Sequence, residues 1–124
     1  MHVYDSSAII ELLEGTPKGE LIAKELSHTL VRITPITVHE ILAGAKDDLH
    51  QELLKSLLET FSILRFGFEE ADVSAKIERS LSKEKKKIND ADLFIAAICF
   101  QNDATLVTCD RDFRKIDGLD VMFF

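Results

Sequence analysis

The sequence predicts a single α/β domain in which a mostly parallel β-sheet lies between two layers of helices. Short apolar segments with the composition of strands alternate along the chain with longer segments of helical periodicity, and this alternation is typical of βαβ units. The chain has 124 residues, which is enough for one domain with its own hydrophobic core. No repeat, low-complexity segment or linker divides it, so we expect one domain over residues 1–124.

The first half of the chain contains three expected strands, each followed by helical sequence. The strand MHVYD ends at Asp5, and the next helix is expected to begin with Ser6 as its N-cap and to stop at Gly15. The strand TLVRI is of the buried, β-branched type, and a helix is expected to begin after Pro35. A run of leucines at helical spacing predicts another helix. Strands are expected at 1–5, 29–33 and 62–66, and helices at 6–15, 17–27, 37–45 and 48–61.

The second half contains two long helices and two strands. An amphipathic helix is expected over residues 69–87, and the next helix, within INDADLFIAAICF, is apolar on every side, which predicts that it is buried. Asn89 is a good N-cap for it, with Asp90 and Asp92 in the first turn near free N–H groups and the positive end of the helix dipole. Strands are expected at 104–108 and 120–124, with a helical turn at 110–116 between them.

The composition is that of an ordinary globular protein, with 46% hydrophobic and 30% charged residues. No apolar run approaches the roughly 18 residues of a membrane span, and the N-terminus lacks the basic region of a signal peptide. We therefore expect a cytoplasmic protein without a membrane partner. Cys99 and Cys109 provide neither a disulfide framework nor the spacing of a zinc site.

The net charge is −7, from 15 basic and 22 acidic residues, which does not favour a general nucleic-acid binder. The run KEKKK, residues 83–87, is nevertheless locally basic. Such a run is either a solvated helix face or a contact surface for phosphates. Lys85, Lys86 and Lys87 are therefore candidate substrate-binding residues.

Four acidic residues are expected at one edge of the sheet, because ligands of parallel sheets bind outside the carboxyl ends of the strands. Asp5 ends the first strand, and Asp110 lies just past the strand 104–108. Asp92 opens the helix before that strand, and Glu40 lies early in the helix after the second strand. Each acid alone could be a cap or a solvated residue, but four together predict a site. Asp112 either faces this site or caps the turn that contains it.

The chemistry of this predicted site is that of a hard divalent cation. Several carboxylates at close range repel one another unless a cation lies among them, and oxygen ligands favour Mg²⁺ or Mn²⁺. The segment HEILA lacks the second histidine of the zinc motif H-E-x-x-H, because Ala43 stands there. Carboxylate-bound Mg²⁺ can activate water and stabilise a phosphodiester transition state. Ser6 directly follows Asp5, and Thr108 precedes Asp110 by two positions, so both could hydrogen-bond a site acid or contact the substrate.

The segments VYDSSAII, TVHEILAG, INDADLFIAA and LVTCDRDF occur in this order and resemble the four motif blocks of the PIN domain, specifically of VapC-type toxins. The resemblance covers essentially the whole chain. It implies a PIN-like three-layer α/β/α fold and Mg²⁺- or Mn²⁺-dependent endoribonuclease activity. In this reading, Asp5, Glu40, Asp92 and Asp110 bind the metal and are catalytic. The resemblance also implies a homodimer and a VapB-like antitoxin, a segment of which covers the acidic cleft.

Other protein classes fit the sequence less well. A response-regulator receiver needs an aspartate at the end of its third strand, where SILRFGF has none. A haloacid-dehalogenase-type phosphatase needs D-x-D after its first strand, but Asp5 is followed by Ser6 and Ser7. Two alternatives stay open: a PIN-like module that binds RNA or protein without cleavage, and a PIN nuclease that processes RNA without being a toxin.

Overall fold

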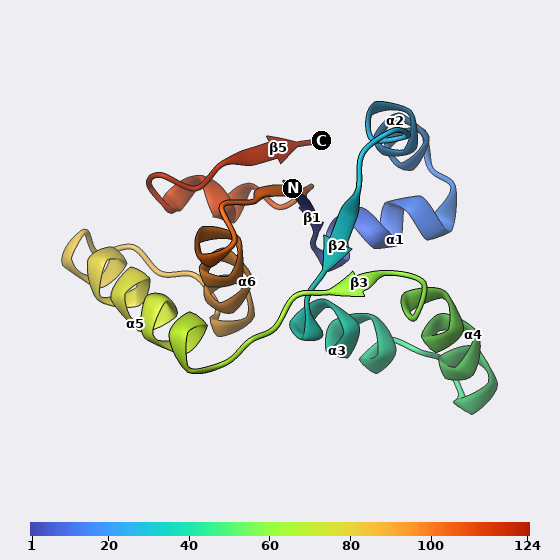
Figure 1. Cartoon of the computed structure of the whole chain (residues 1–124), viewed down its shortest axis with the longest axis horizontal. Coiled ribbons are helices and arrows are strands. Elements are labelled where there is room, and N and C mark those ends of the chain that lie inside the picture. Colours follow the sequence, from blue (N-terminus) through green and yellow to red (C-terminus); the bar gives the residue numbers. More distant parts are fainter.

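The computed structural model describes all 124 residues, and its centre is a five-stranded sheet in which all neighbouring strands are parallel (Figure 1). The strand order is β3-β2-β1-β4-β5. The predicted α/β class is thus confirmed, and the sheet is wholly rather than mostly parallel. The strands are β1 (His2–Tyr4), β2 (Val31–Ile33), β3 (Ser62–Ile63), β4 (Thr105–Thr108) and β5 (Val121–Phe123).

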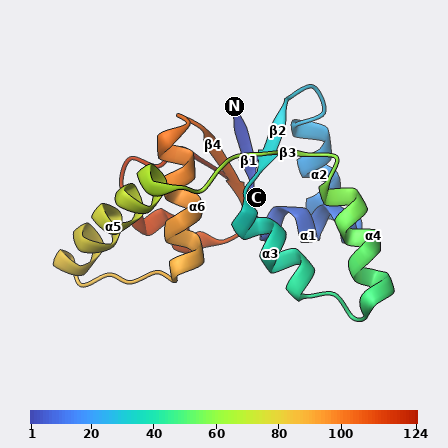
Figure 2. The same ribbon diagram turned by 60° about the horizontal axis from the view of Figure 1, so that its bottom comes forward.

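Helices cover both faces of this sheet, which confirms the three-layer arrangement (Figure 2). Consecutive strand residues point to opposite faces. Val3 and Leu106 therefore pack under the helices between residues 68 and 115, while Tyr4 and Val107 pack under the helices between residues 6 and 58. None of the helices is long and apolar enough to cross a bilayer. The helices are α1 (Ser6–Glu14), α2 (Pro17–Glu25), α3 (Pro35–Ala43), α4 (Asp48–Leu58), α5 (Phe68–Lys83), α6 (Asp90–Gln101) and the 3-10 helix η1 (Arg111–Lys115).

The N-terminal ends of two helices differ from the sequence prediction. The N-cap of α1 is Asp5 rather than Ser6, because the Asp5 carboxylate accepts from the Ala8 N–H. Helix α3 begins at Pro35 rather than after it, with Thr34 as the cap, since proline fits the first helical position. Two other predicted ends are confirmed: Gly15 terminates α1 with a φ of 63°, and Asn89 caps α6.

Several elements are shorter than predicted; α4, for example, ends at Leu58 rather than at residue 61. Helix α5 ends at Lys83, so the predicted helix over residues 69–87 extends too far, and Lys85, Lys86 and Lys87 lie in the turn that leads to α6. The third strand was predicted over residues 62–66, but only residues 62–63 pair with β2. The rest of that segment forms the connection to α5.

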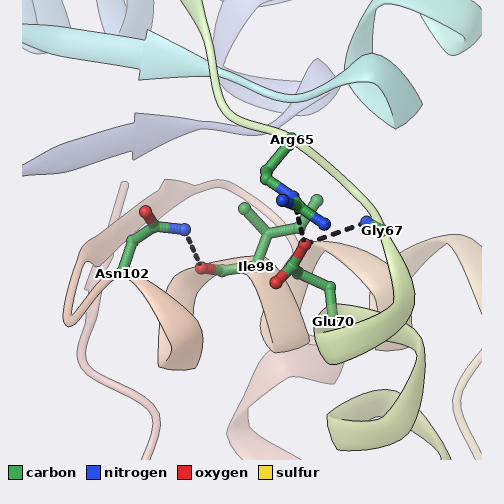
Figure 3. Close-up of polar contacts among 5 residues, drawn as sticks. All are labelled: Arg65, Gly67, Glu70, Ile98 and Asn102. Atoms are coloured by element: carbon green, nitrogen blue, oxygen red, sulfur yellow. Dashed lines mark hydrogen bonds and ion pairs between the residues drawn. The ribbon is translucent and has the colours of Figure 1, made fainter.

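A buried carboxylate fixes this connection at the start of α5 (Figure 3). The Glu70 side chain is 4% exposed, and its Oε1 accepts from the Gly67 N–H at 2.9 Å and pairs with Arg65 Nε at 3.3 Å. Because Gly67 is the N-cap and has no side chain of its own, Glu70 supplies the capping interaction from the third helical position.

Replacing Glu70 with alanine is expected to destabilise the fold by about 1–2 kcal/mol, because the cap N–H loses its acceptor. The adjacent Glu69 is exposed and is the matched control. Glu69→Ala is expected to cost less than about 0.5 kcal/mol. Urea unfolding of both variants measures the difference, and equal midpoints would show that the Glu70 contacts do not stabilise the start of α5.

Candidate metal centre

All four predicted acids lie near the carboxyl edge of the sheet. Asp5 directly follows β1, and Asp110 follows β4 after one residue. Because β1 and β4 are parallel neighbours, their carboxyl ends lie side by side, and the Asp5 N–H donates to Val107 O at 3.2 Å. Asp92 lies in the first turn of α6, and Glu40 lies in α3. Ser6 is the first residue of α1, and its hydroxyl donates to Glu40 Oε1 at 2.9 Å, which links α3 to this edge.

Hydroxyl groups hold the Asp5 carboxylate in one orientation. Its Oδ1 accepts from the Ser7 hydroxyl at 2.7 Å and from the Ala8 N–H at 3.0 Å, and its Oδ2 accepts from the Thr108 hydroxyl. Both hydroxyls also accept from backbone N–H groups of the two residues that follow β4. Ser7 Oγ accepts from the Cys109 N–H at 2.9 Å, and Thr108 Oγ1 accepts from the Asp110 N–H at 3.0 Å. Asp5 and Asp110 are therefore positioned by one shared network.

The Asp92 carboxylate is the least satisfied group of the site. Asp92 is 7% exposed, and its Oδ2 is buried without a hydrogen-bond partner. Burial raises its pKa to about 7, with further contributions from the charges of Asp110, Glu40, Asp5 and Asp112. A buried oxygen that lacks a donor and faces several other carboxylates is expensive to ionise, unless a cation supplies the missing partner.

The pKa of Asp5 is also raised. Burial is the main cause, the hydrogen bonds from Thr108, Ser7 and Ala8 oppose it, and the charge of Asp110 adds to it. Asp5 therefore differs from Asp92 in having its oxygens hydrogen-bonded.

The carboxylates fit a divalent cation. Asp92, Asp110 and Asp112 each offer an oxygen, and these oxygens all lie within 4.8 Å of one another. Hard divalent cations take carboxylate oxygens and complete their coordination with water or phosphate. The structure therefore places Asp112 with the site acids, in addition to its hydrogen bond from its own backbone N–H to Asp110 Oδ1 at 2.9 Å. Asp5 and Glu40 lie outside this closest group of oxygens and adjoin it.

Two features of the site escaped the sequence prediction. The Ser7 hydroxyl hydrogen-bonds both Asp5 and the Cys109 N–H, although the sequence analysis named only Ser6 and Thr108 as hydroxyl residues of the site. The second serine of the segment DSS is the sequence feature that could have indicated this contact. Lys115 is the other, because its Nζ pairs with Asp112 Oδ1 at 3.3 Å and donates to the Lys87 carbonyl at 3.2 Å. Nothing in the sequence around Lys115 indicated that its side chain contacts the acidic site.

A parallel sheet with carboxylates gathered at its carboxyl edge, one of them buried and unpartnered, defines an α/β protein with a site that fits a divalent cation. The chain belongs to the PIN-domain family, whose sequence pattern matches residues 3–119, and within it to the family of proteins named ribonuclease VapC. It is 32% identical to ribonuclease VapC1 of Rickettsia felis and 35% identical to ribonuclease VapC of Rickettsia bellii. Each alignment covers 97% of this chain and 93% of the relative.

Solved structures confirm the PIN fold. The structure of VapBC2 from Rickettsia felis, bound to a DNA fragment from its promoter, is similar with a TM-score of 0.85 at 19% identity, covering 99% of this chain and 98% of that one. FitAcB from Neisseria gonorrhoeae is similar with a TM-score of 0.82 at 29% identity, covering 100% of this chain and 97% of that one.

Proposed function

We propose that this protein is a VapC-type endoribonuclease that hydrolyses RNA phosphodiester bonds with Mg²⁺ or Mn²⁺. The observation that carries the proposal is the buried, unpartnered Asp92 oxygen beside Asp110 and Asp112. The relatives named ribonuclease VapC support the same reaction. All four acids that the sequence indicated are present at the carboxyl edge, so the chain has the residues that this chemistry needs.

The acids have different proposed roles. Asp92 and Asp110 would hold the ion, Asp112 would lie beside them, and Asp5 would add its negative charge nearby. A bound divalent cation lowers the pKa of water and offsets the charge that develops on the phosphodiester. Glu40 accepts from Ser6 through Oε1, which leaves Oε2 to orient the attacking water or to contribute to the metal site.

Ser6 and Thr108 were both predicted as substrate contacts, but their different surroundings in the structure favour different roles. Thr108 is fully buried and bonded to both Asp5 and Asp110, so we propose that it positions these acids and does not touch RNA. Ser6 is half-buried and donates to Glu40, and it stays a proposed substrate contact at the edge of the acidic site. Lys85, Lys86 and Lys87 are exposed and are the proposed phosphate contacts.

Purified protein is expected to cleave RNA in millimolar Mg²⁺ or Mn²⁺ and to be inactive in EDTA, with activity restored by excess ion. The substrate for this test is a mixed cellular RNA preparation, because it contains tRNA, rRNA and mRNA together. RNA that is bound but left intact under every ion condition would favour the alternative, a PIN-like binding module that does not cleave.

The proposed partners are a cognate VapB-like antitoxin and a second copy of the chain. Several solved structures of this fold are VapBC complexes, and one is a toxin–antitoxin complex from Klebsiella pneumoniae. A groove of about 590 Å³ between α1, α3 and α4 offers a place for an antitoxin segment. Leu13, Leu53 and Leu57 line it, all of them exposed, and Glu40 lies on the same lining. A segment in this groove would reach the edge of the acidic site.

Leu53→Glu is expected to weaken binding of the co-expressed antitoxin at least about tenfold, because a charge enters an apolar contact surface. Leu53 is 64% exposed and Leu30 is 66% exposed, and only Leu53 lies in the groove. Leu30→Glu is therefore the matched control, and both variants should keep the stability of the parent. Affinity co-purification with the cognate antitoxin measures the effect, and equal recovery with both variants would place the antitoxin elsewhere.

A further inference from the structure

Basic side chains are concentrated beside the acidic site, although the chain as a whole carries a charge of −7. The lysine turn, residues 83–87, contains four lysines and one glutamate, and η1 contains two arginines, one lysine and one aspartate. These ten residues hold seven of the 15 basic residues and only two of the 22 acidic ones. Their local charge of +5 is opposite in sign to that of the protein.

One side chain joins these two segments to each other and to the acids. Lys115 Nζ donates to the Lys87 carbonyl at 3.2 Å and pairs with Asp112 Oδ1 at 3.3 Å. The Asp112 carboxylate lies within 4.8 Å of ligand oxygens of Asp92 and Asp110. The lysine turn and η1 therefore form one continuous basic surface that begins at the acidic site.

The cationic groups of this surface face solvent. Lys85, Lys86 and Lys87 are exposed, and of these three only Lys86 has an ion-pair partner, Glu84 at 3.1 Å. The three lysines line a hollow of about 440 Å³. On η1, the exposed guanidinium groups of Arg111 and Arg114 lie 5.0 and 5.2 Å from the centre of the Phe123 ring. The ring holds both groups in place without neutralising their charge.

The backbone of the turn gives no reason for a lysine at position 85. The Lys86 N–H donates to Leu81 O at 2.8 Å and the Lys85 N–H to Ser82 O at 3.1 Å, which is the Schellman pattern that ends a helix. Lys85 has the left-handed φ of 58° that this pattern requires, and glycine is the favoured residue there. A favourable interaction with the dipole of α5 accounts for basic residues in its last turn, but Lys86 and Lys87 lie beyond that turn.

We infer that this basic surface, formed by η1 and the lysine turn beside the acidic site, binds the RNA backbone and so sets the path of the strand away from the acids. The inference rests on the proposed RNA cleavage. Lys and Arg contacts to phosphates are independent of sequence, and here they offset the repulsion between RNA and a strongly acidic protein. The exposed guanidinium planes of Arg111 and Arg114 also suit stacking on unpaired bases.

The test compares two triple variants that each remove three positive charges. Lys85→Gln/Lys86→Gln/Lys87→Gln removes them from the basic surface, and Lys24→Gln/Lys55→Gln/Lys76→Gln removes them from α2, α4 and α5 elsewhere. Binding of a fluorescein-labelled, mixed-sequence, single-stranded 20-nucleotide RNA is followed by anisotropy in EDTA between 50 and 200 mM KCl. We expect the first variant to raise Kd at least about tenfold and to lower the slope of log Kd against log salt by about 2, since each lost contact removes about 0.7. The second variant should stay within about twofold of the parent.

Lys85→Gly separates binding from folding. It removes the charge and relaxes the left-handed backbone, so unfolding stability should equal or exceed that of the parent while RNA binding weakens. In the cleavage assay with Mg²⁺, the first triple variant should raise KM and leave kcat unchanged, because the lost contacts bind substrate and transition state equally.

The outcomes distinguish this inference from the proposed activity. If the first triple variant binds and cleaves RNA like the parent, the inference that the basic surface binds RNA is wrong, and the proposed nuclease activity is unaffected. Equal weakening by both triple variants also overturns it, because the effect is then one of net charge alone. If the parent cleaves no RNA, and only the first triple variant binds RNA more weakly than the parent, the results support the basic surface as an RNA-binding site and contradict the proposed nuclease activity.

Discussion

Replacing Asp92 with asparagine is expected to stabilise the ion-free protein above pH 7 and to remove its stabilisation by Mg²⁺. The pKa of Asp92 is raised from its ordinary value to about 7 in the folded state, mainly by burial. The folded protein therefore holds this proton more tightly than the unfolded chain does. The stabilising effect of the proton is complete below the unfolded pKa and is lost as the pH rises from about 4 to about 7.

The size of this effect is on the order of 2–4 kcal/mol between pH 4 and pH 8. An asparagine side chain carries no charge at either pH, so Asp92→Asn should match the parent near pH 4 and exceed its stability by that amount at pH 8. Mg²⁺ is expected to narrow this difference at pH 8, because an ion that binds only the folded parent adds about 2.7 kcal/mol at 100 times its Kd. Urea unfolding at both pH values, with EDTA or millimolar Mg²⁺, measures all four conditions.

Two results would contradict this prediction. A parent and variant with equal stability at pH 8 would show that Asp92 is ionised without penalty, as a solvated helix cap would be. A variant that gains as much stability from Mg²⁺ as the parent does would show that the ion binds elsewhere.

Replacing Asp5 with asparagine is expected to reduce RNA cleavage by about 10²–10³-fold at saturating Mg²⁺, because the site loses one negative charge that helps to hold and orient the cation. The fold should persist. An asparagine oxygen can still accept from Ser7 and Ala8, and its amide can donate to Thr108, which reverses only one hydrogen bond of the network. Circular dichroism and the unfolding midpoint verify this before activity is compared.

Asp103→Asn is the matched control for the change at Asp5. Asp103 is exposed at the far end of α6, and its φ of 50° is one that asparagine tolerates well. This variant should cleave RNA at the rate of the parent. Retained cleavage by Asp5→Asn would show that this carboxylate is structural, and loss of cleavage in both variants would point to net charge instead.

The class of fold was predictable because apolar strands alternate with amphipathic helices along the chain. This order of elements favours a parallel sheet with helices on both faces over other layer arrangements. The same rule brought distant acids together. Asp5 and Asp110 follow strands whose carboxyl ends meet, and Asp92 and Glu40 lie on helices that pack beside that edge. The chemistry of these residues alone indicates only a divalent cation acting on a phosphodiester. The resemblance to known motif blocks added the expectation that the substrate is RNA.

The errors lie where tertiary contacts override local preference. Serine and aspartate are both good N-caps, so the sequence could not decide between Asp5 and Ser6. The run KEKKK favours helix at every position, yet α5 ends at Lys83 because the chain turns to bury Ile88 beside Leu81. The contacts of Ser7 and Lys115 depend on side-chain orientations across elements far apart in the sequence, which no periodicity encodes.

The most direct test of the metal centre is titration of Mn²⁺ into the protein, followed by the electron paramagnetic resonance signal of the free ion. The parent is expected to deplete the free signal, with one or two ions bound per chain, and Asp92→Asn to deplete it far less. The titration is repeated with the labelled 20-nucleotide RNA, because phosphate oxygens complete the coordination of such ions. Equal depletion by parent and variant, with and without RNA, would contradict the assignment of these acids as a metal site.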